Sequence, residues 1–454
     1  MRLALLCATS FLSTGAIAAP LSTAQIGAID AAAQKTLKTT GVPAVSIAVV
    51  EDGAIVYAHA YGLQRAGAPA RAEARYKIAS ISKQFTAQAM LLLAEDGKLS
   101  LDDPVSKYLP GLTRANEIKL RQLLSHTSGY RDYWPQDFSF ADMAEPTTPA
   151  HILDKWARTP LDFDPGTRWQ YSNTGYVIAG QIVEKVAGMP LLDFLKLRMF
   201  DRLGMHPVDQ DIGLTDADPL GYHRYAAGPV LVEKQAAPGW LYAAGELAMS
   251  ASDLARYDIS VIDQTILKTA SYREQQTEVL LTNGAGTDYG LGVDVDVRKG
   301  HRRISHGGEA VGYLSQNRIY PDDHAAIVVL DNADFGNAQT SIADAIEDII
   351  FADNGDVGRA RNVFEGLRAG KIDRAQFTAN GNYYFTAQAL ADYRTSLAAL
   401  GEPKSFTRKS SSLRGGFTAE VYTLDYGTKK LTIVLRAEPG PNGRIEQFTV
   451  YPAD

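Results

Sequence analysis

The strongest constraint on the fold is that strand-like segments stand at both ends of residues 22–350. Residues 45–57 alternate apolar and small side chains around the two-residue turn Asp52-Gly53, which is typical of a β-hairpin. Residues 313–320 and 325–331 form a second pair, and the pattern between the two pairs is mostly helical. Because both ends must then complete one sheet, the sequence predicts an α+β fold: an antiparallel sheet with flanking helices and a helical subdomain.

Helices are predicted at both edges of this region. Ser22 and Gln25 have the spacing of a capping box, and the helical pattern that follows them ends at Gly41. Apolar residues recur at helical spacing again over 342–349. A change of composition at residues 353–356 predicts a linker, so we expect the main domain to span residues 22–352.

Residues 357–454 predict a small C-terminal α+β domain. A helical pattern in this segment ends at Gly401, and apolar residues alternate with polar neighbours over 431–435. The segment carries no cluster of His, Asp and Ser that indicates chemistry. We therefore expect packing, contact with a partner or support of a lid from this accessory domain.

Residues 1–18 have the pattern of a secretory signal peptide. Arg2 precedes a short apolar run, and the small residues Ala16 and Ala18 predict cleavage after Ala18. The alternative is a first buried helix, but the charge, the short run and the small-residue exit together favour export. The single cysteine, Cys7, lies inside this segment, so a mature secreted or periplasmic chain would form no disulfide.

Composition excludes several classes of function. The chain has 454 residues, a net charge of −7 and no block of basic residues, which makes it a poor binder of nucleic acid. Beyond the signal, no stretch approaches the roughly 18 to 20 apolar residues of a membrane span. The sequence also lacks a Gly-x-Ser-x-Gly elbow, a zinc-binding helix motif and a phosphate loop, so we expect no metal and no cofactor. The sequence does not indicate an oligomeric state.

The first chemical motif is Ser80-Ile81-Ser82-Lys83, the only Ser-x-x-Lys in the chain. It opens a helical pattern that ends at Gly97, and residues three positions apart lie on one helix face, so Lys83 can reach Ser80. In an apolar pocket the pKa of this lysine would fall, and the neutral amine would accept the hydroxyl proton. The alternative is a capping serine with a surface lysine.

A second motif, Tyr171-Ser172-Asn173, is the only Tyr-x-Asn in the chain. It precedes a helical pattern that ends at Gly188, which places the triplet on a loop where side chains can converge on a cleft. A tyrosine oxygen near a lysine relays protons, and the Asn173 amide can hold a substrate carbonyl or fix the lysine. Taken alone, Asn173 is equally typical of a helix N-cap.

The third motif is His306-Gly307-Gly308, which follows a strand-like segment over residues 302–304. Paired glycines let a substrate backbone approach the edge of a strand closely. His306 could then donate to, or protonate, the reacting group. A buried structural histidine is the competing interpretation.

In their order and separations, the three motifs resemble one superfamily. The sequence is similar to serine β-lactamases and penicillin-binding proteins, in the branch of class C β-lactamases, D-alanyl-D-alanine carboxypeptidases, D-aminopeptidases and related esterases. The resemblance runs from about residue 24 to residue 350 and includes segments 78–110, 124–129 and 245–257. It implies a β-lactamase/transpeptidase-like fold for this region.

The resemblance also implies a role for each motif residue. Ser80 is the nucleophile that forms an acyl-enzyme, and Lys83 and Tyr171 share its deprotonation and the protonation of the leaving group. Which of these two is the base is disputed in this superfamily. Asn173 orients the substrate, and the backbone N–H groups of Ser80 and Glu309 form the oxyanion hole. His126 and Ser128 belong to a family loop, in which we expect them to be structural.

This sequence departs from the β-lactamase pattern at the third motif. Class C enzymes have Lys-Thr-Gly where this chain has His306-Gly307-Gly308 followed by Glu309, so a hydroxyl and a permanent positive charge are missing. A Glu309 side chain in the cleft would repel a substrate carboxylate and favour neutral esters or an amino-bearing substrate, whereas strand alternation could instead turn it away. His306, with an ordinary pKa near 6.5, predicts a limb in the pH–rate profile between about 6 and 7.5.

The predicted function is that of an exported serine hydrolase. It would cleave a small-molecule ester, or an amide or peptide of the D-amino-acid type, through Ser80. One alternative is a D-alanyl-D-alanine carboxypeptidase or a weak β-lactamase. Another is a penicillin-binding sensor that acylates without turnover, with residues 357–454 contacting a partner.

Overall fold

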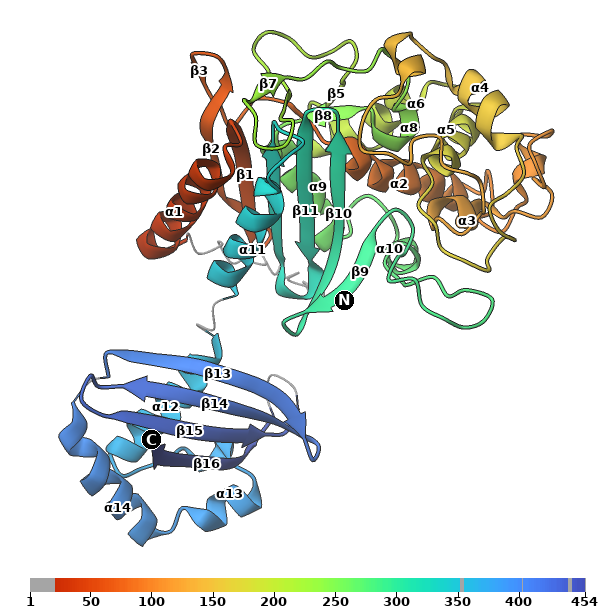
Figure 1. Ribbon diagram of the computed structural model, residues 1–454. Helices are drawn as coiled ribbons and strands as arrows, with labels where there is room; N and C mark the ends of the chain where they lie inside the picture. Colours follow the sequence, from red (N-terminus) through yellow and green to blue (C-terminus); the bar gives the residue numbers. More distant parts are fainter. Residues whose placement is uncertain (1–20, 352–354, 402, 440–442, 454) are drawn as a thin grey trace, which may run out of the picture. The chain divides into compact units, whose positions relative to one another are not determined.

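A computed structural model describes residues 21–351, 355–401, 403–439 and 443–453, and the chain divides into two compact units between residues 349 and 350. The first unit is built on a seven-stranded antiparallel sheet in the order β3-β2-β1-β12-β11-β10-β9 (Figure 1). Strand β1 pairs with β2 on one side and with β12 on the other, so the two ends of the unit meet in one sheet. This confirms the predicted sheet.

The strands follow the predicted hairpins closely. The two-residue turn before β2 has both residues in the left-handed region, with φ of 49° at Asp52 and 72° at Gly53. The strands of the large sheet are β1 (Ala44–Glu51), β2 (Ala54–Arg65), β3 (Ala68–Pro69), β9 (Asp294–Arg298), β10 (His301–Ala310), β11 (Tyr313–Tyr320) and β12 (Ala325–Asp331). The short strands outside it are β4 (Tyr76–Lys77), β5 (Val208–Asp209), β6 (Tyr222–His223), β7 (Leu231–Val232) and β8 (Leu247–Met249).

Helices cover both faces of the large sheet. Neighbouring residues of β11 point to opposite faces: Asn317 donates to Asp258 of α9, and Arg318 donates to Glu347 of α11. Helix α9 therefore covers one face and α11 the other. The helices of this unit are α1 (Thr23–Thr40), α2 (Ser82–Glu95), α3 (Leu120–Leu124), α4 (Pro149–Ile152), α5 (Asn173–Ala187), α6 (Leu191–Leu195), α7 (Asp201–Leu203), α8 (Tyr242–Gly245), α9 (Ala251–Ile262), α10 (Thr269–Gln275) and α11 (Ala338–Ile350).

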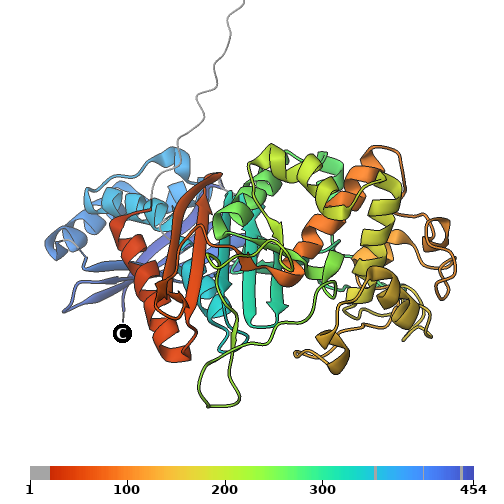
Figure 2. The same ribbon diagram turned by 90° about the horizontal axis from the view of Figure 1, so that it is seen from above.

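The helical subdomain lies beside the sheet, as Figures 1 and 2 show. Its central element is α2, which is buried from Ser82 to Leu93 and packs against α5 and α8. A helix that is buried on all sides is held rigidly by its neighbours. The residues at the N-terminal end of α2 are therefore fixed between the subdomain and the sheet.

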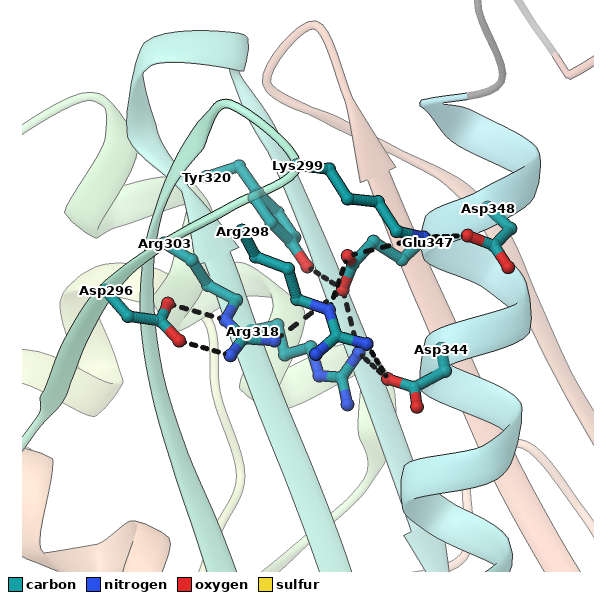
Figure 3. A network of polar contacts seen from close by, with 9 residues as sticks. All are labelled: Asp296, Arg298, Lys299, Arg303, Arg318, Tyr320, Asp344, Glu347 and Asp348. Atoms are coloured by element: carbon teal, nitrogen blue, oxygen red, sulfur yellow. Dashed lines mark hydrogen bonds and ion pairs between the residues drawn. The ribbon is translucent and has the colours of Figure 1, made fainter. Parts of the chain in front are cut away.

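A network of paired charges joins α11 to the sheet (Figure 3). Glu347 accepts hydrogen bonds from Arg318 and Arg298 at 2.9 Å each and from the Tyr320 hydroxyl at 2.9 Å. Arg318 also lies 2.7 Å from Asp344. Only 1% of the Glu347 side chain and 4% of the Arg318 side chain are exposed, so each buried charge is compensated by an opposite one.

The second unit holds a four-stranded antiparallel sheet in the order β13-β14-β15-β16, with an aromatic core that includes Phe364, Tyr422 and Phe448. Its elements are α12 (Gly355–Arg368), α13 (Ala379–Tyr384), α14 (Ala387–Leu397), β13 (Ser405–Arg414), β14 (Phe417–Asp425), β15 (Lys430–Ala437) and β16 (Ile445–Pro452). Helix α12 begins inside the segment predicted as a linker, so any linker is shorter than predicted.

The predicted signal peptide, residues 1–18, lies outside the described residues. Within the described part of the chain, no helix is long and apolar enough to cross a membrane. In the same residues, no group of three or more His, Cys, Asp or Glu side chains is arranged to hold a metal ion.

Candidate active site

Ser80 lies in a 3₁₀ turn, Ala79–Ile81, immediately before α2. The preceding residue, Ala79, has φ of +48°, a left-handed conformation that costs a residue with a Cβ roughly 1 to 2 kcal/mol. Such strain persists only where the surrounding packing enforces it, and it is common at functional sites. Ser80 is half-buried and its side chain lines a cleft, so the turn presents a hydroxyl to the outside.

Strand β10 runs directly against this turn. A Cβ on Gly308 would stand only 2.2 Å from the carbonyl oxygen of Ile78, so a side chain at this position is excluded. Gly307 is different, because a Cβ there would meet nothing nearer than 3.8 Å. Gly308 therefore lets β10 approach the protein's own backbone at Ile78. The approach of a substrate backbone at the glycine pair stays a prediction.

Lys83 is fully buried and its ammonium group faces only uncharged acceptors. Its Nζ atom donates to Ser80 Oγ at 3.0 Å, to Asn173 Oδ1 at 2.8 Å and to the backbone oxygen of Ala244 at 2.7 Å. Burial lowers the pKa of Lys83 to about 7, an effect that the charge of Asp132 partly offsets. The alternative of a surface lysine is wrong.

Tyr171 also lies beside the lysine, with its ring centroid 4.9 Å from the Lys83 Nζ atom. Burial raises the pKa of the Tyr171 phenol, and a hydrogen bond with the Ser80 side chain only partly opposes this. The phenol is therefore neutral at ordinary pH. It can pass a proton on, but it is a poor candidate for the base.

His126 holds the loop that carries Tyr171. Its ring stacks on Tyr171 at 4.2 Å between centroids, and its Nδ1 accepts from the backbone N–H of Ser172 at 3.1 Å. Burial keeps the pKa of His126 well below its usual value, so the ring is neutral. Ser172, rather than Asn173, is the N-cap of α5, because its hydroxyl accepts from the N–H of Gly175.

Asp132 is a site residue that sequence analysis missed. One carboxylate oxygen accepts from the backbone N–H of Asn173 at 3.0 Å, and the other accepts from Asn173 Nδ2 at 3.3 Å. The first oxygen also accepts from the N–H of Trp134 at 3.2 Å. The only sequence signal was its position three residues beyond the 124–129 segment.

His306 lies close to the site but in a different state from the one expected. Its Nδ1 contacts the Gly307 carbonyl oxygen at 2.5 Å and its Nε2 contacts the Tyr289 hydroxyl at 2.9 Å. A carbonyl can only accept, so Nδ1 carries the proton and Nε2 accepts from the phenol. Burial, together with the charge of Lys83, lowers the pKa of His306 to about 3. The expected titration of His306 between about 6 and 7.5 is therefore wrong.

The cleft above Ser80 has a volume of about 460 Å³ and an acidic lining. Three carboxylates, from Asp132, Asp137 and Glu309, line it without a lysine or arginine among the lining residues described. Of the two orientations considered for Glu309, the structure has the one that faces the cleft. Burial raises the pKa of Glu309, and the charge of Asp137 raises it further.

Residues 29–349 match the family described as Beta-lactamase, and the chain belongs to this family of serine hydrolases. Penicillin-binding protein 4* of Bacillus subtilis is 30% identical over 334 residues, 69% of this chain and 73% of that protein. A D-aminopeptidase of Cereibacter sphaeroides is 30% identical over 300 residues, 63% of this chain and 55% of that protein. The chain thus spans little more than half of that relative.

The fold is also found in solved structures. A D-stereospecific amidohydrolase from a Streptomyces species matches 70% of this chain and 97% of its own, with a TM-score of 0.60 and 29% identity. The comparisons confirm the β-lactamase/transpeptidase-like fold predicted from the motifs.

Proposed function

We propose that the protein is an exported serine hydrolase that cleaves an ester or a D-amino-acid-type amide through an acyl-enzyme on Ser80. The observation that carries this proposal is the contact of Lys83 Nζ with Ser80 Oγ at 3.0 Å, in a buried environment that brings the pKa of the lysine to about 7. A base with a pKa near the working pH is efficient at proton transfer.

The pKa of Lys83 is lowered and that of Tyr171 is raised, which makes Lys83 the base and Tyr171 the proton relay. Neutral Lys83 keeps two N–H bonds, to Asn173 and Ala244, and turns its lone pair to the Ser80 hydroxyl. Ser80 Oγ then bonds to the substrate carbonyl carbon as its proton passes to Lys83. When the bond from that carbon to the leaving group breaks, Tyr171 gives its phenolic proton to the leaving group and takes up the proton held by Lys83, so the phenol and the neutral amine are both restored; water later hydrolyses the acyl-enzyme. A phenolate at Tyr171 would require a much higher pH.

Backbone N–H groups of Ser80 and Glu309 are proposed to hold the oxyanion. Because Gly308 has no side chain, β10 can lie directly against the turn that carries Ser80, which supports this assignment. Preorganised donors of this kind typically contribute about 100- to 1,000-fold in rate. Strand β9 pairs with β10 only as far as Ser305, which leaves the edge of β10 at Gly307 available to a substrate backbone.

The acidic cleft supports a substrate that is neutral or carries an amino group next to the reacting carbonyl. Glu309 and Asp137 would repel a terminal carboxylate, which argues against efficient cleavage of penicillins or of D-alanyl-D-alanine peptides. Similarity to D-aminopeptidases and to a D-stereospecific amidohydrolase favours the same class of substrate.

Intact-mass spectrometry after brief exposure to p-nitrophenyl butyrate, D-alanine p-nitroanilide or a penicillin tests this function. We expect release of chromophore from the ester or the anilide, loss of that turnover in a folded Ser80→Ala variant, and little lasting penicilloyl adduct. A stable penicilloyl adduct on Ser80 without turnover would favour the carboxypeptidase or sensor alternative instead. Equal turnover by Ser80→Ala would contradict the assignment of the nucleophile.

A further inference from the structure

We propose that Asp132 is a positioning residue that orients the Asn173 amide toward Lys83. This inference rests on the proposed function of Ser80 and Lys83. Its basis is a continuous chain of hydrogen bonds. The Asp132 carboxylate accepts from the backbone N–H and from the side-chain Nδ2 of Asn173, and Asn173 Oδ1 accepts from Lys83 Nζ.

The direction of the Asn173 amide is set by Asp132. A carboxylate only accepts hydrogen bonds, so the NH₂ of Asn173 must face Asp132 and its oxygen must face Lys83. The reverse orientation would place two donors against each other at Lys83. Because Asp132 also binds the backbone N–H of Asn173, it fixes both the backbone and the side chain of that residue.

The charge of Asp132 acts on Lys83 as well. The aromatic rings of Tyr171 and Tyr176 lie 4.9 and 5.4 Å from Nζ, and both phenols are neutral because burial raises their pKa. His126 from the 124–129 loop and His306 from β10 are also neutral, because burial lowers their pKa. The remaining contacts of Lys83 are a hydroxyl, an amide oxygen and a backbone carbonyl.

Among the described residues, Asp132 is therefore the anion that raises the pKa of Lys83 against the effect of burial. Only 9% of Asp132 is exposed, so water screens this interaction weakly. Without Asp132, the amine would lose its proton at lower pH and would face an amide free to turn. The two effects can be measured separately. The lost charge moves the limb of the pH profile, and the amide that is free to turn lowers the rate at high pH.

The test compares Asp132→Asn with Asp137→Asn, a matched loss of charge from the same cleft at a residue that the structure gives no hydrogen bond to Asn173 or Lys83. For Asp132→Asn we expect kcat/KM on the plateau to fall by up to about 100-fold, because a misplacement of about 1 Å of a reacting group costs that much. The acid limb of the profile should also move to lower pH by about one unit. Asp137→Asn should keep the limb in place.

Two further measurements make the result decisive. If Asp132 acts through Asn173, its substitution should cost much less kcat/KM in an Asn173→Ala background than in the wild type. The NMR titration of the Lys83 ε-carbon, in protein made with labelled lysine, follows the same shift without any turnover, so it stands even if the proposed reaction is wrong. A loss of thermal stability with an unchanged Lys83 midpoint would overturn the proposal, as would equal profiles for the two single variants.

Discussion

Two buried cations in the first unit have opposite surroundings. Arg318 lies 2.9 Å from Glu347 and 2.7 Å from Asp344, so its charge is compensated at close range (Figure 3). Lys83 is equally buried, but its three hydrogen-bond acceptors carry no charge. A compensated charge stays fixed and contributes to structure, whereas a poorly compensated one titrates easily. This difference in compensation distinguishes Arg318, which has a structural role, from Lys83, which is the candidate base.

The largest expected effect is on turnover at the poorly compensated cation. Lys83→Met should lower kcat/KM for the ester or the anilide by about 100- to 10,000-fold, because it removes the proton acceptor of Ser80. Rate assays on the purified variant, with circular dichroism to verify folding, measure this. The exposed Lys98→Met is the matched control, and comparable losses in both variants would contradict the assigned base.

At the compensated cation the expected effect is on stability instead. Glu347→Gln leaves Arg318 buried beside one fewer negative charge, so the free energy of unfolding should fall by about 3 to 5 kcal/mol. Denaturant unfolding measures this. Asp348→Asn, at the exposed end of the same network, should cost less than about 1 kcal/mol. A large loss of kcat/KM in folded Glu347→Gln protein would show that the two regions are not separate.

Substitution of His306 sharpens the assignment of the titrating group. Because His306 is already neutral, His306→Gln should keep the acid limb near pH 7 and lower the plateau by less than about tenfold. The profile rises with pH because the neutral form of Lys83 is the base. Disappearance of the acid limb in this variant would show that His306, and not Lys83, is the group that titrates.

The smallest expected effect concerns specificity. Glu309→Gln removes one carboxylate from the cleft, so the preference for D-alanine p-nitroanilide over its N-succinyl derivative should fall by roughly 3- to 10-fold. The ratio of the two kcat/KM values measures this. An unchanged ratio would show that Glu309 does not sense the charge of the substrate.

Features that depend on residues close together in the sequence could be predicted from it. Ser22 caps α1 and Gly41 ends it, as the local pattern predicted. Ser80 and Lys83 are three residues apart, so helical geometry alone brings them together. Tyr171 and Asn173 stood out as the only Tyr-x-Asn in the chain, but their place beside Lys83 followed from the family resemblance, because a distance of about 90 residues carries no periodic signal.

Individual side-chain contacts between distant segments could not be predicted. Asp132 binds Asn173 across 41 residues and Arg318 binds Glu347 across 29, and neither pair belongs to one helix or hairpin. The state of His306 also escaped prediction, because it depends on burial and on a tyrosine 17 residues away. Protonation follows from surroundings that only the folded chain assembles.

The most direct test of this account is the pH titration of Lys83 itself. In protein labelled at the lysine ε-carbon, the resonance that is absent from Lys83→Met should titrate with a midpoint near 7, well below the value of about 10.4 for an ordinary lysine. A midpoint above 9 would mean that Lys83 is an ammonium ion at working pH, and would contradict its role as the base for Ser80.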